Sequence, residues 1–247
     1  MFNIIKLQHF LTHLTLIFFS IFFNALSDNY IYMYYENEFV PTNWENLSSD
    51  YNHCHNGNSQ SPINITPSLN KIKNLKYFYS SLKPEQIVDN KGTALKLKQN
   101  NQNYILINDK KYNLVQFHFH NLSEHTLNSK KYDMELHLVH QNEDDTLAVI
   151  GILIKEGKSH SEIKKLLNYH PDKNIPENST NINLGRLLPN NSNIYNYVGS
   201  LTTPPCTEGV NWLVMDKPIE ASIDEITALR NLIKFNSRPI QNFKIAS

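Results

Sequence analysis

The sequence predicts a mainly β protein, folded as a single domain around a central, largely antiparallel sheet. Short runs rich in β-branched and aromatic residues recur between residues 94 and 154, and turn sequences such as Asn-Asp and Glu-Asp-Asp separate them. Helical periodicity is confined to two short segments later in the chain. The 247 residues contain no internal repeat and no long linker, so the chain fits one large domain with a substantial core.

The N-terminal segment is expected to lie outside this domain. Residues 1–27 contain a lone Lys6, an apolar run over 10–23, and the ending Ala25-Leu26-Ser27, whose small residues suit a signal peptidase. We therefore expect a secretory signal over 1–27, a mature domain over 28–247, and a secreted or periplasmic protein. The alternative is an uncleaved membrane anchor, but the run is shorter than the roughly 18 apolar residues of a membrane span.

Charge and cysteine content narrow the function classes. The 23 basic residues balance 23 acidic ones, which argues against a nucleic acid or an anionic membrane surface as partner. The two cysteines, Cys54 and Cys206, are expected to form a disulfide in an oxidising compartment. The alternative is a pair of free buried thiols.

Seven regular elements and one loop can be placed in order. The predicted strands are 94–98, 104–107, 114–119, 134–140 and 147–154. A helix over 161–169 carries apolar residues on one face, and a helix over 222–235 starts with Ser222 and Glu225 in a capping-box pattern. The segment 170–193, rich in Pro, Asn and Ser, is predicted to be loop.

The stretch QFHFHNLSEHT, residues 116–126, contains the first candidate site residues. Side chains alternate along a strand, so His118 and His120 point to one face while Phe117 and Phe119 point to the other. Such a histidine pair is by itself a weak signal, because paired histidines are more often surface or core residues. However, five of the 11 histidines fall between residues 118 and 140.

The next predicted strand, with the sequence MELHLVH, offers a third imidazole. As an antiparallel neighbour it could bring either His137 or His140 beside the first pair, and these two face opposite sides. Glu135 shares a face with His137 and could accept an imidazole N–H, as carboxylates do beside metal-binding histidines. We therefore favour His137 as the third ligand and expect His140 to be a packed histidine. Three neutral imidazoles with an open fourth position are typical of catalytic Zn²⁺.

Eight sequence strings occur in an order that resembles the α-class carbonic anhydrases along nearly all of the expected mature chain. They are Asn43-Trp44, QSPINI at 60–65, QFHFH at 116–120, SEHT at 123–126, ELHLVH at 135–140, AVIGIL at 148–153, YVGSLTTPPCTEGVNW at 197–212 and NSRPIQ at 236–241. The resemblance implies a twisted, largely antiparallel sheet of about ten strands with a few short peripheral helices and a conical cleft. It also implies Zn²⁺ on His118, His120 and His137. In this family, the standard example of the effect, zinc lowers the pKa of its bound water to about 7, and the resulting hydroxide attacks carbon dioxide to give bicarbonate and a proton.

The resemblance also implies roles for residues around the zinc ligands. Gln116 should hold His118, and Glu135 should hold His137. Thr202 should accept the proton of the zinc-bound hydroxide and donate to Glu124, which orients the nucleophile. Thr203 should lie beside the anion site, and His125 should be structural. An apolar wall for carbon dioxide should consist of Val139, Leu147, Val149, Leu201, Val210 and Trp212. The resemblance also supports the disulfide between Cys54 and Cys206, because secreted members of the family contain this bridge.

Two departures from the family pattern bear on catalysis. Fast members place a proton-carrying histidine where this chain has Thr93, and threonine has no pKa near 7. We therefore expect proton transfer to limit turnover; nothing in the sequence places His53 or His55 in the cleft as a substitute. Met33-Tyr34-Tyr35 replaces the usual Trp-x-Tyr, with Tyr35 matched to the tyrosine that contacts the threonine through solvent.

The sequence leaves two other functions open. One is a related binding protein without catalysis, a class that typically loses zinc ligands; this chain keeps all three. The other is a zinc-dependent esterase, which would use the same hydroxide as a side activity. A homodimer is also possible.

Overall fold

A computed structural model describes residues 41–73, 75–82, 86–87, 94–96, 102–168, 181–233 and 235–242. The expected signal over 1–27, Tyr35 and Thr93 lie outside these residues. Within the described ranges, no helix is long and apolar enough to cross a membrane.

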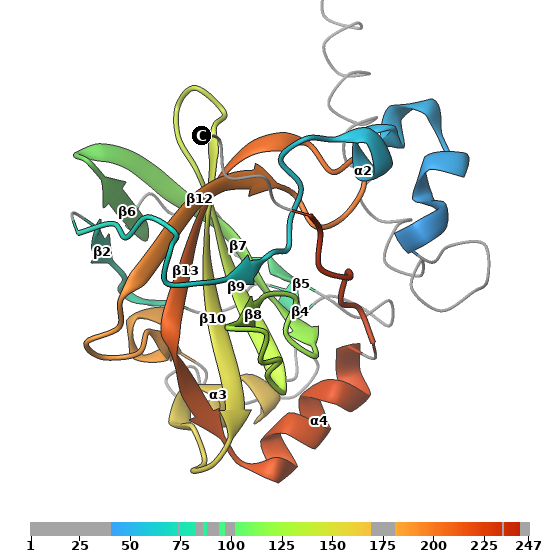
Figure 1. The fold of residues 1–247 in the computed structure, drawn as a ribbon. Coiled ribbons are helices and arrows are strands. Elements are labelled where there is room, and N and C mark those ends of the chain that lie inside the picture. The colour runs from blue at the N-terminus through green and yellow to red at the C-terminus, as the bar shows by residue number, and fades with distance from the viewer. Residues whose placement is uncertain are drawn as a thin grey trace, which may run out of the picture.

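The fold is a twisted nine-stranded sheet (Figure 1), which confirms the predicted mainly β class. Seven strands follow the order β12-β13-β10-β9-β7-β5-β4, β6 also pairs with β7, and β2 pairs with β6. Among the described pairings of this sheet, only β10 with β13 is parallel. The bounds are β2 Leu75–Phe78, β4 Gln86–Ile87, β5 Ala94–Lys96, β6 Tyr104–Ile107, β7 Lys110–Asn121, β9 Met134–Gln141, β10 Leu147–Glu156, β12 Ile194–Ser200 and β13 Glu208–Ala221.

The central strands are buried on both faces, so each face packs against its own apolar cluster. Phe117 and Phe119 lie in the larger cluster with Leu136 and Leu138 of β9, as alternation predicted. Val149 and Trp212 lie in a second cluster on the opposite face. Burial on both faces explains why β10 has a nearly continuous apolar sequence. His118 and His120 of β7 lie on the same face of the sheet as this second cluster.

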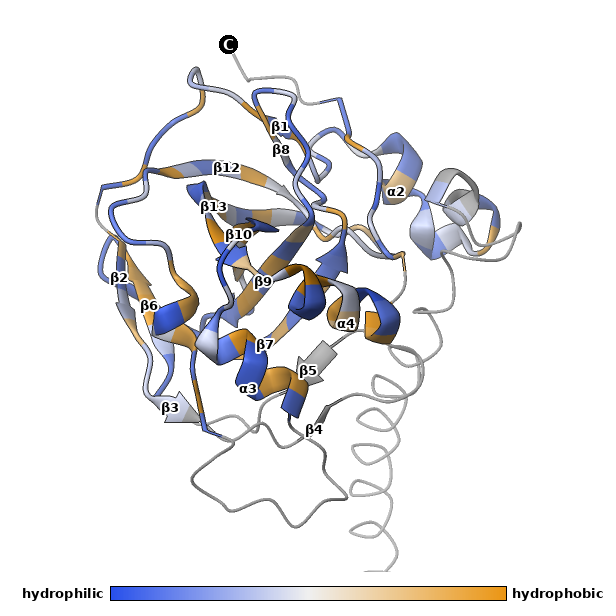
Figure 2. Ribbon diagram, turned by 90° about the horizontal axis from the view of Figure 1, so that it is seen from below, coloured by the Kyte–Doolittle hydropathy of each residue, from blue (hydrophilic) through white to orange (hydrophobic). Residues whose placement is uncertain are grey.

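Short elements cover the edges of the sheet. The helices α3 (Ser161–Asn168) and α4 (Ile223–Ile233) pack together at one end (Figure 1), and Figure 2 shows that both contain hydrophilic and hydrophobic residues. Near the described N-terminal end lie three short helices, and two small sheets pair β1 with β8 and β3 with β11. Their bounds are η2 Pro41–Asn46, η3 Ser49–Tyr51, α2 His53–Asn56, β1 Asn64–Ile65, β8 Thr126–Leu127, β3 Ser81–Leu82 and β11 Ile182–Asn183.

The loop predicted over 170–193 is partly wrong. Its described portion contains β11 and a short helix, η5 (Leu184–Leu187). Three apolar residues in this polar stretch, Ile182, Leu184 and Leu187, are fully buried in the larger cluster. Asn183 caps η5, because its side-chain oxygen accepts from the Gly185 N–H at 3.0 Å. Burial of these three apolar residues therefore orders a segment whose composition is typical of a loop.

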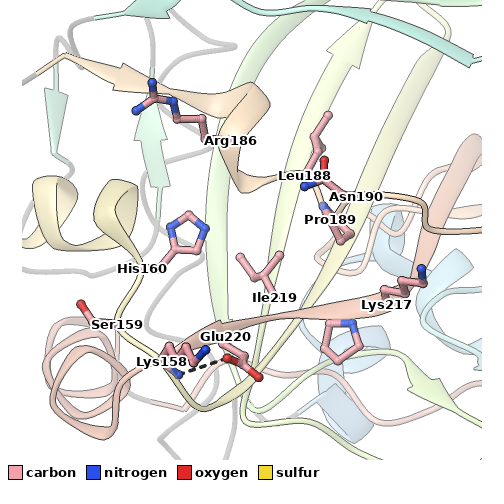
Figure 3. Close-up of a pocket in the computed structure, with 11 residues that line it drawn as sticks. Lys158, Ser159, His160, Arg186, Leu188, Pro189, Asn190, Lys217, Ile219 and Glu220 are labelled. Atoms are coloured by element: carbon pink, nitrogen blue, oxygen red, sulfur yellow. Dashed lines mark hydrogen bonds between the residues drawn. The ribbon is translucent and has the colours of Figure 1, made fainter.

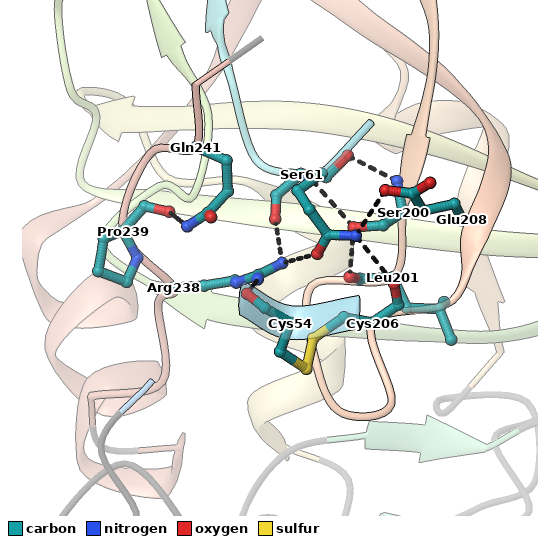
Figure 4. Close-up of a disulfide and its surroundings, with 10 residues drawn as sticks. Cys54, Ser61, Ser200, Leu201, Cys206, Glu208, Arg238, Pro239 and Gln241 are labelled. Carbon is teal, nitrogen blue, oxygen red and sulfur yellow. Dashed lines mark hydrogen bonds between the residues drawn. A yellow bond between two sulfur atoms is a disulfide. The ribbon is translucent and has the colours of Figure 1, made fainter. Parts of the chain in front are cut away.

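The predicted disulfide between Cys54 and Cys206 is present, with an S–S distance of 2.04 Å (Figure 4). Beside it, the fully buried guanidinium of Arg238 donates to the Cys54 carbonyl at 2.7 Å, the Ser61 carbonyl at 2.7 Å and Gln60 Oε1 at 3.0 Å. The Gln60 side chain in turn donates to the Cys206 carbonyl at 3.1 Å. This network joins the N-terminal helices, the loop after β12 and the C-terminal segment around one buried cation.

Candidate metal centre

The register of two central strands brings three histidines together. In the β7–β9 ladder, His118 lies directly opposite His137, and His120 follows two residues along on the same face. The ring centroids are 4.9 Å apart for His118 and His120, 5.1 Å for His118 and His137, and 4.5 Å for His120 and His137. One ring nitrogen from each histidine lies within 4.8 Å of the others. His118, His120 and His137, which the alternation of side chains along the strands favoured as ligands, thus lie close together in space.

Each histidine is also held through its second ring nitrogen. His118 Nδ1 lies 2.8 Å from Gln116 Oε1, and His137 Nε2 lies 2.9 Å from Glu135 Oε1. His120 Nδ1 lies 2.9 Å from the backbone carbonyl of Asn236. All three partners are acceptor oxygens, so these nitrogens carry the protons and the opposite nitrogens keep their lone pairs. The three lone pairs belong to His118 Nε2, His120 Nε2 and His137 Nδ1.

Burial keeps the imidazoles neutral. It lowers the pKa of His120 to about 4, that of His118 well below its ordinary value, and that of His137 in the same direction. In addition, His120 Nε2 is buried and has no hydrogen-bond partner in the described part of the protein. A buried acceptor nitrogen without a partner is costly unless something binds it. A cluster of three neutral imidazoles with such a nitrogen fits a Zn²⁺ ion.

Glu124 lies beside these nitrogens and is itself fully buried. Its Oε2 is 3.4 Å from His120 Nε2 and 3.9 Å from His137 Nδ1, while its Oε1 accepts the Arg238 backbone N–H at 2.9 Å. The Thr202 side chain is also hydrogen-bonded to this carboxyl group. Burial raises the pKa of Glu124 to about 7 despite these contacts. The structure therefore brings the two residues assigned to orient the nucleophile against the histidine cluster.

The six predicted wall residues form one apolar cluster next to the histidines. Val139, Val149, Val210 and Trp212 are buried, and Leu147 and Leu201 pack against them. The Trp212 ring lies 4.8 Å from the His137 ring. Thr203, from the same loop as Thr202, is exposed. An apolar cluster thus lies next to the histidines whose ring nitrogens keep their lone pairs.

His140 faces the other side of β9, as predicted. Its Nε2 lies 2.8 Å from the Tyr79 hydroxyl, and its ring is fully buried. Burial lowers the pKa of His140 to about 3. It is a neutral core histidine and does not contribute to the cluster.

Two functional neighbours could not be found from the residue pattern. Asn236 holds His120 through a backbone carbonyl, and Arg238 holds Glu124 through a backbone N–H. Every residue carries these groups, so no side-chain signal points to them. The segment that supplies them is fixed locally, because the Asn236 side chain donates to the Phe119 carbonyl at 3.0 Å and accepts the Asn121 N–H at 2.7 Å.

A surface pocket of about 410 Å³ lies elsewhere on the molecule (Figure 3). Its lining includes Lys158, Arg186, Lys217 and Glu220 but none of the three histidines. Glu220 forms an ion pair with Lys155 at 3.1 Å and accepts the backbone N–H of Lys158 at 3.3 Å. Arg186 forms an ion pair with Glu162 at 3.4 Å. Glu220 and Arg186 are thus each paired with a neighbouring residue of opposite charge. The pocket therefore does not compete with the histidine cluster as the candidate site.

Comparison with known proteins gives one family. The model of the eukaryotic-type carbonic anhydrase family matches residues 40–244. A carbonic anhydrase from Pectobacterium carotovorum is 33% identical over 225 residues, covering 90% of this chain and 92% of the relative. One from Nostoc sp. is 36% identical over 215 residues, covering 81% and 79%. The solved α-carbonic anhydrase of Thermovibrio ammonificans, a complex with the inhibitor sulfanilamide, matches with a TM-score of 0.76 and 34% identity, covering 84% of this chain and 94% of that one.

Proposed function

Because the chain belongs to the eukaryotic-type carbonic anhydrase family, we propose that it catalyses the reversible hydration of carbon dioxide to bicarbonate and a proton at the histidine cluster. The observation that carries the proposal is the convergence of three neutral imidazoles beside a wall of apolar side chains. This combination suits a small uncharged substrate that must meet a nucleophile made from water.

The residues that would hold Zn²⁺ are His118, His120 and His137. When bound, zinc would act as a Lewis acid that lowers the pKa of a coordinated water to about 7, as is established for carbonic anhydrases. The Gln116 oxygen, the Asn236 carbonyl and the Glu135 carboxylate would keep the three rings in the orientation that directs their lone pairs inward.

Thr202 and Glu124 would orient the nucleophile. In its ionised form the carboxyl group of Glu124 can only accept a hydrogen bond, so the Thr202 hydroxyl then donates to it. The threonine oxygen can then accept the O–H of the attacking oxygen, which directs a lone pair of that oxygen toward the substrate carbon. The Arg238 N–H donates to Oε1 of Glu124 at 2.9 Å and so limits rotation of the carboxylate.

The wall formed by Val139, Leu147, Val149, Leu201, Val210 and Trp212 would receive carbon dioxide. Apolar side chains exclude water without offering a competing hydrogen bond, and a drier site strengthens the field of the charged groups beside it. Thr203, exposed next to this wall, would lie beside the bicarbonate product.

We further propose that residues 1–27 are a secretory signal and that the protein acts outside the cytoplasm. The apolar run and the small residues before Asp28 support this location, and so does the disulfide between Cys54 and Cys206, a bond that persists in oxidising compartments. Mass spectrometry of the exported protein is expected to find an N-terminus near Asp28. A retained N-terminal segment in the exported protein would contradict the signal assignment.

Stopped-flow measurement of carbon dioxide hydration tests the activity. The purified, zinc-loaded protein is expected to hydrate carbon dioxide, whereas the protein treated with a chelator and the His120→Ala variant are expected to be nearly inactive. Re-addition of zinc should restore the chelated wild type but not the variant. A folded, zinc-loaded wild type without hydration would overturn the proposal in favour of a binding protein.

A further inference from the structure

A buried chain of hydrogen bonds links the third histidine to the loop that carries Thr202. It starts at Glu135 Oε1, which lies 2.9 Å from His137 Nε2 and 2.7 Å from His125 Nδ1. His125 Nε2 lies 2.7 Å from the Tyr197 hydroxyl, and that hydroxyl lies 2.8 Å from Ser61 Oγ. These side chains are at most 5% exposed, so solvent does not supply alternative partners.

The far end of the chain reaches the loop through two serines. Ser61 Oγ accepts the Ser200 N–H at 3.0 Å, and Ser200 Oγ accepts the Ser61 N–H at 2.9 Å. The Ser200 hydroxyl then donates to the Leu201 carbonyl at 2.8 Å, one residue before Thr202. The Trp212 indole N–H donates to the Ser200 carbonyl at 2.9 Å and fixes the same turn from the other side.

The directions of these bonds follow from the chemistry of the groups. The Glu135 carboxylate accepts from both imidazoles, so His125 carries its proton on Nδ1 and leaves a lone pair on Nε2. Tyr197 must then donate its O–H to His125, and the tyrosine oxygen accepts the Ser61 O–H. Ser61 Oγ still has a lone pair for the Ser200 N–H. Each hydrogen bond of this network therefore has one donor. The donors that point toward Glu135 are, in order, Ser200 N–H, Ser61 O–H, Tyr197 O–H and His125 Nδ1–H.

Two glycines leave the space that this chain requires. A Cβ at Gly199 would collide with Ser61 Oγ and with a Tyr197 ring carbon, and a Cβ at Gly151 would lie 2.9 Å from Glu135 Oε1. The backbone at Gly199 and at Gly151 therefore lies close to the two ends of this series of hydrogen bonds. The close approach locks the positions of the tyrosine ring and the carboxylate.

We propose that Tyr197 is a positioning residue, whose hydroxyl braces His125 against Glu135 and so sets the orientation of the His137 ring toward the metal. Tyr197 touches neither substrate nor metal; it acts through His125 and Glu135. Through Ser61 and Ser200 the same hydroxyl ties the metal-binding face of β9 to the loop that carries Thr202. The inference rests on the proposed function only in assuming that His137 binds zinc.

The test compares two tyrosines on one strand. Tyr197→Phe removes the hydroxyl and keeps the ring, and Tyr195→Phe is the matched control. Tyr195 lies two residues away in the same buried cluster, and its hydroxyl makes no hydrogen bond within the described residues. The zinc dissociation constant is measured for the full protein by competition with a chromophoric chelator, and thermal unfolding of each metal-free variant shows that it is folded.

We expect Tyr197→Phe to raise the zinc dissociation constant by about tenfold, the lower end of the range for residues that support metal ligands, and Tyr195→Phe to leave it near the wild-type value. If Tyr197→Phe does not fold, Ser61→Ala, which breaks the chain one link further out, should weaken zinc binding several-fold. Equal zinc affinity in wild type and in the folded Tyr197 or Ser61 variant would overturn the inference. A wild type that binds zinc but hydrates no carbon dioxide would instead contradict the proposed function, because zinc affinity is measured independently of activity.

Discussion

At the scale of single residues, the candidate centre depends on groups from distant parts of the chain. The carboxyl of Glu124, in the segment after β7, meets the Thr202 side chain and the Arg238 backbone N–H. It lies within 3.4 Å of a ring nitrogen that has no other partner in the described structure. Its environment is therefore defined by tertiary contacts, and small changes around it should alter catalysis more than stability.

Replacement of Thr202 tests the orientation of the nucleophile. Thr202→Ala removes the hydroxyl that is proposed to link Glu124 to the attacking oxygen, and we expect kcat/KM for carbon dioxide hydration to fall by about 10²-fold, because misplacement of a reacting group has effects of this size. Stopped-flow kinetics at saturating zinc measure the loss. Thr207→Ala is the control, since Thr207 is exposed in the same loop, and its rate should stay close to that of the wild type. Equal losses in both variants would show that the loop, not the hydroxyl, matters.

Proton transfer gives a second prediction at this scale. Thr93 lies outside the described residues, and its side chain cannot carry a proton near neutral pH. Turnover is expected to rise with the concentration of an imidazole-type buffer, and Thr93→His should raise turnover at low buffer by providing an internal acid–base group. Rates across a buffer series measure both effects. Fast turnover that does not depend on buffer would mean that another group carries the proton; His53 and His55 are both exposed on α2.

Some of the residue contacts were predictable from the sequence and some were not. Gln116 and Glu135 each lie two residues from the histidine they hold, and residues two apart on a strand share a face. The choice of His137 over His140 follows from the same rule. The Asn236 carbonyl and the Tyr197 hydroxyl reach the centre only through the tertiary fold. Alternation along a strand contains no information about them.

At the scale of elements, the strands with alternating or continuous apolar patterns were predicted and two long ones were not. β7, β9 and β10 contain the predicted runs, although all three strands extend beyond them, β9 by a single residue. β12 and β13 were not assigned from the residue pattern. β13 contains Gly209 and Pro218, and the ladder between β12 and β13 has an irregular register near Gly199. Such residues mark turns in a local analysis, whereas here pairing on both sides of β13 keeps the strand extended.

The predicted capping box of α4 is present and has a testable pH dependence. Ser222 Oγ accepts the Glu225 N–H at 3.2 Å, and Glu225 accepts the Ser222 N–H at 2.9 Å and the His160 N–H at 3.0 Å. Burial opposes ionisation of Glu225, but these bonds and one from the Ser159 hydroxyl outweigh it and hold the pKa of Glu225 below its ordinary value. The ionised carboxylate therefore stabilises the folded state above pH 4.3, the approximate value for an unfolded chain, and this contribution is lost as pH falls through the folded pKa.

Glu225→Gln is expected to lower the free energy of unfolding at pH 7 by about 1 kcal/mol, because a neutral amide oxygen accepts the Ser222 and His160 N–H groups more weakly than a charged carboxylate does. The difference from wild type should shrink as pH falls below about 4, because the wild-type carboxyl group is then protonated as well. Urea unfolding across pH 3–7 measures it. Asp224→Asn, at an exposed position in the same helical turn, is the control for the loss of one negative charge. A constant difference between Glu225→Gln and wild type at every pH would contradict the assignment.

At the scale of the whole molecule, the disulfide links segments 152 residues apart. The chain-entropy model assigns a loop of that size about 5 kcal/mol of stabilisation, because the bond restricts the unfolded chain. Reduction is therefore expected to lower the free energy of unfolding by several kcal/mol, measured by urea unfolding with and without a reductant. The Cys54→Ser/Cys206→Ser double variant should resemble the reduced protein and should not respond to reductant. An unchanged stability on reduction would show that native contacts, such as those of Arg238, already hold these segments together.

The C-terminal segment, residues 235–242, has a consequence for how the site is completed during biosynthesis. It supplies the carbonyl that holds His120 and the N–H that holds Glu124, and it follows every described helix and strand in the chain. A ribosome produces the chain from the N-terminus, so β7 and β9 emerge long before these two groups. A nascent chain can therefore pair its histidine-bearing strands but cannot yet orient His120 or Glu124. If the three histidines bind zinc as proposed, full metal affinity requires residues 235–242 as well, and the order of synthesis delays tight loading with metal until this segment has been made.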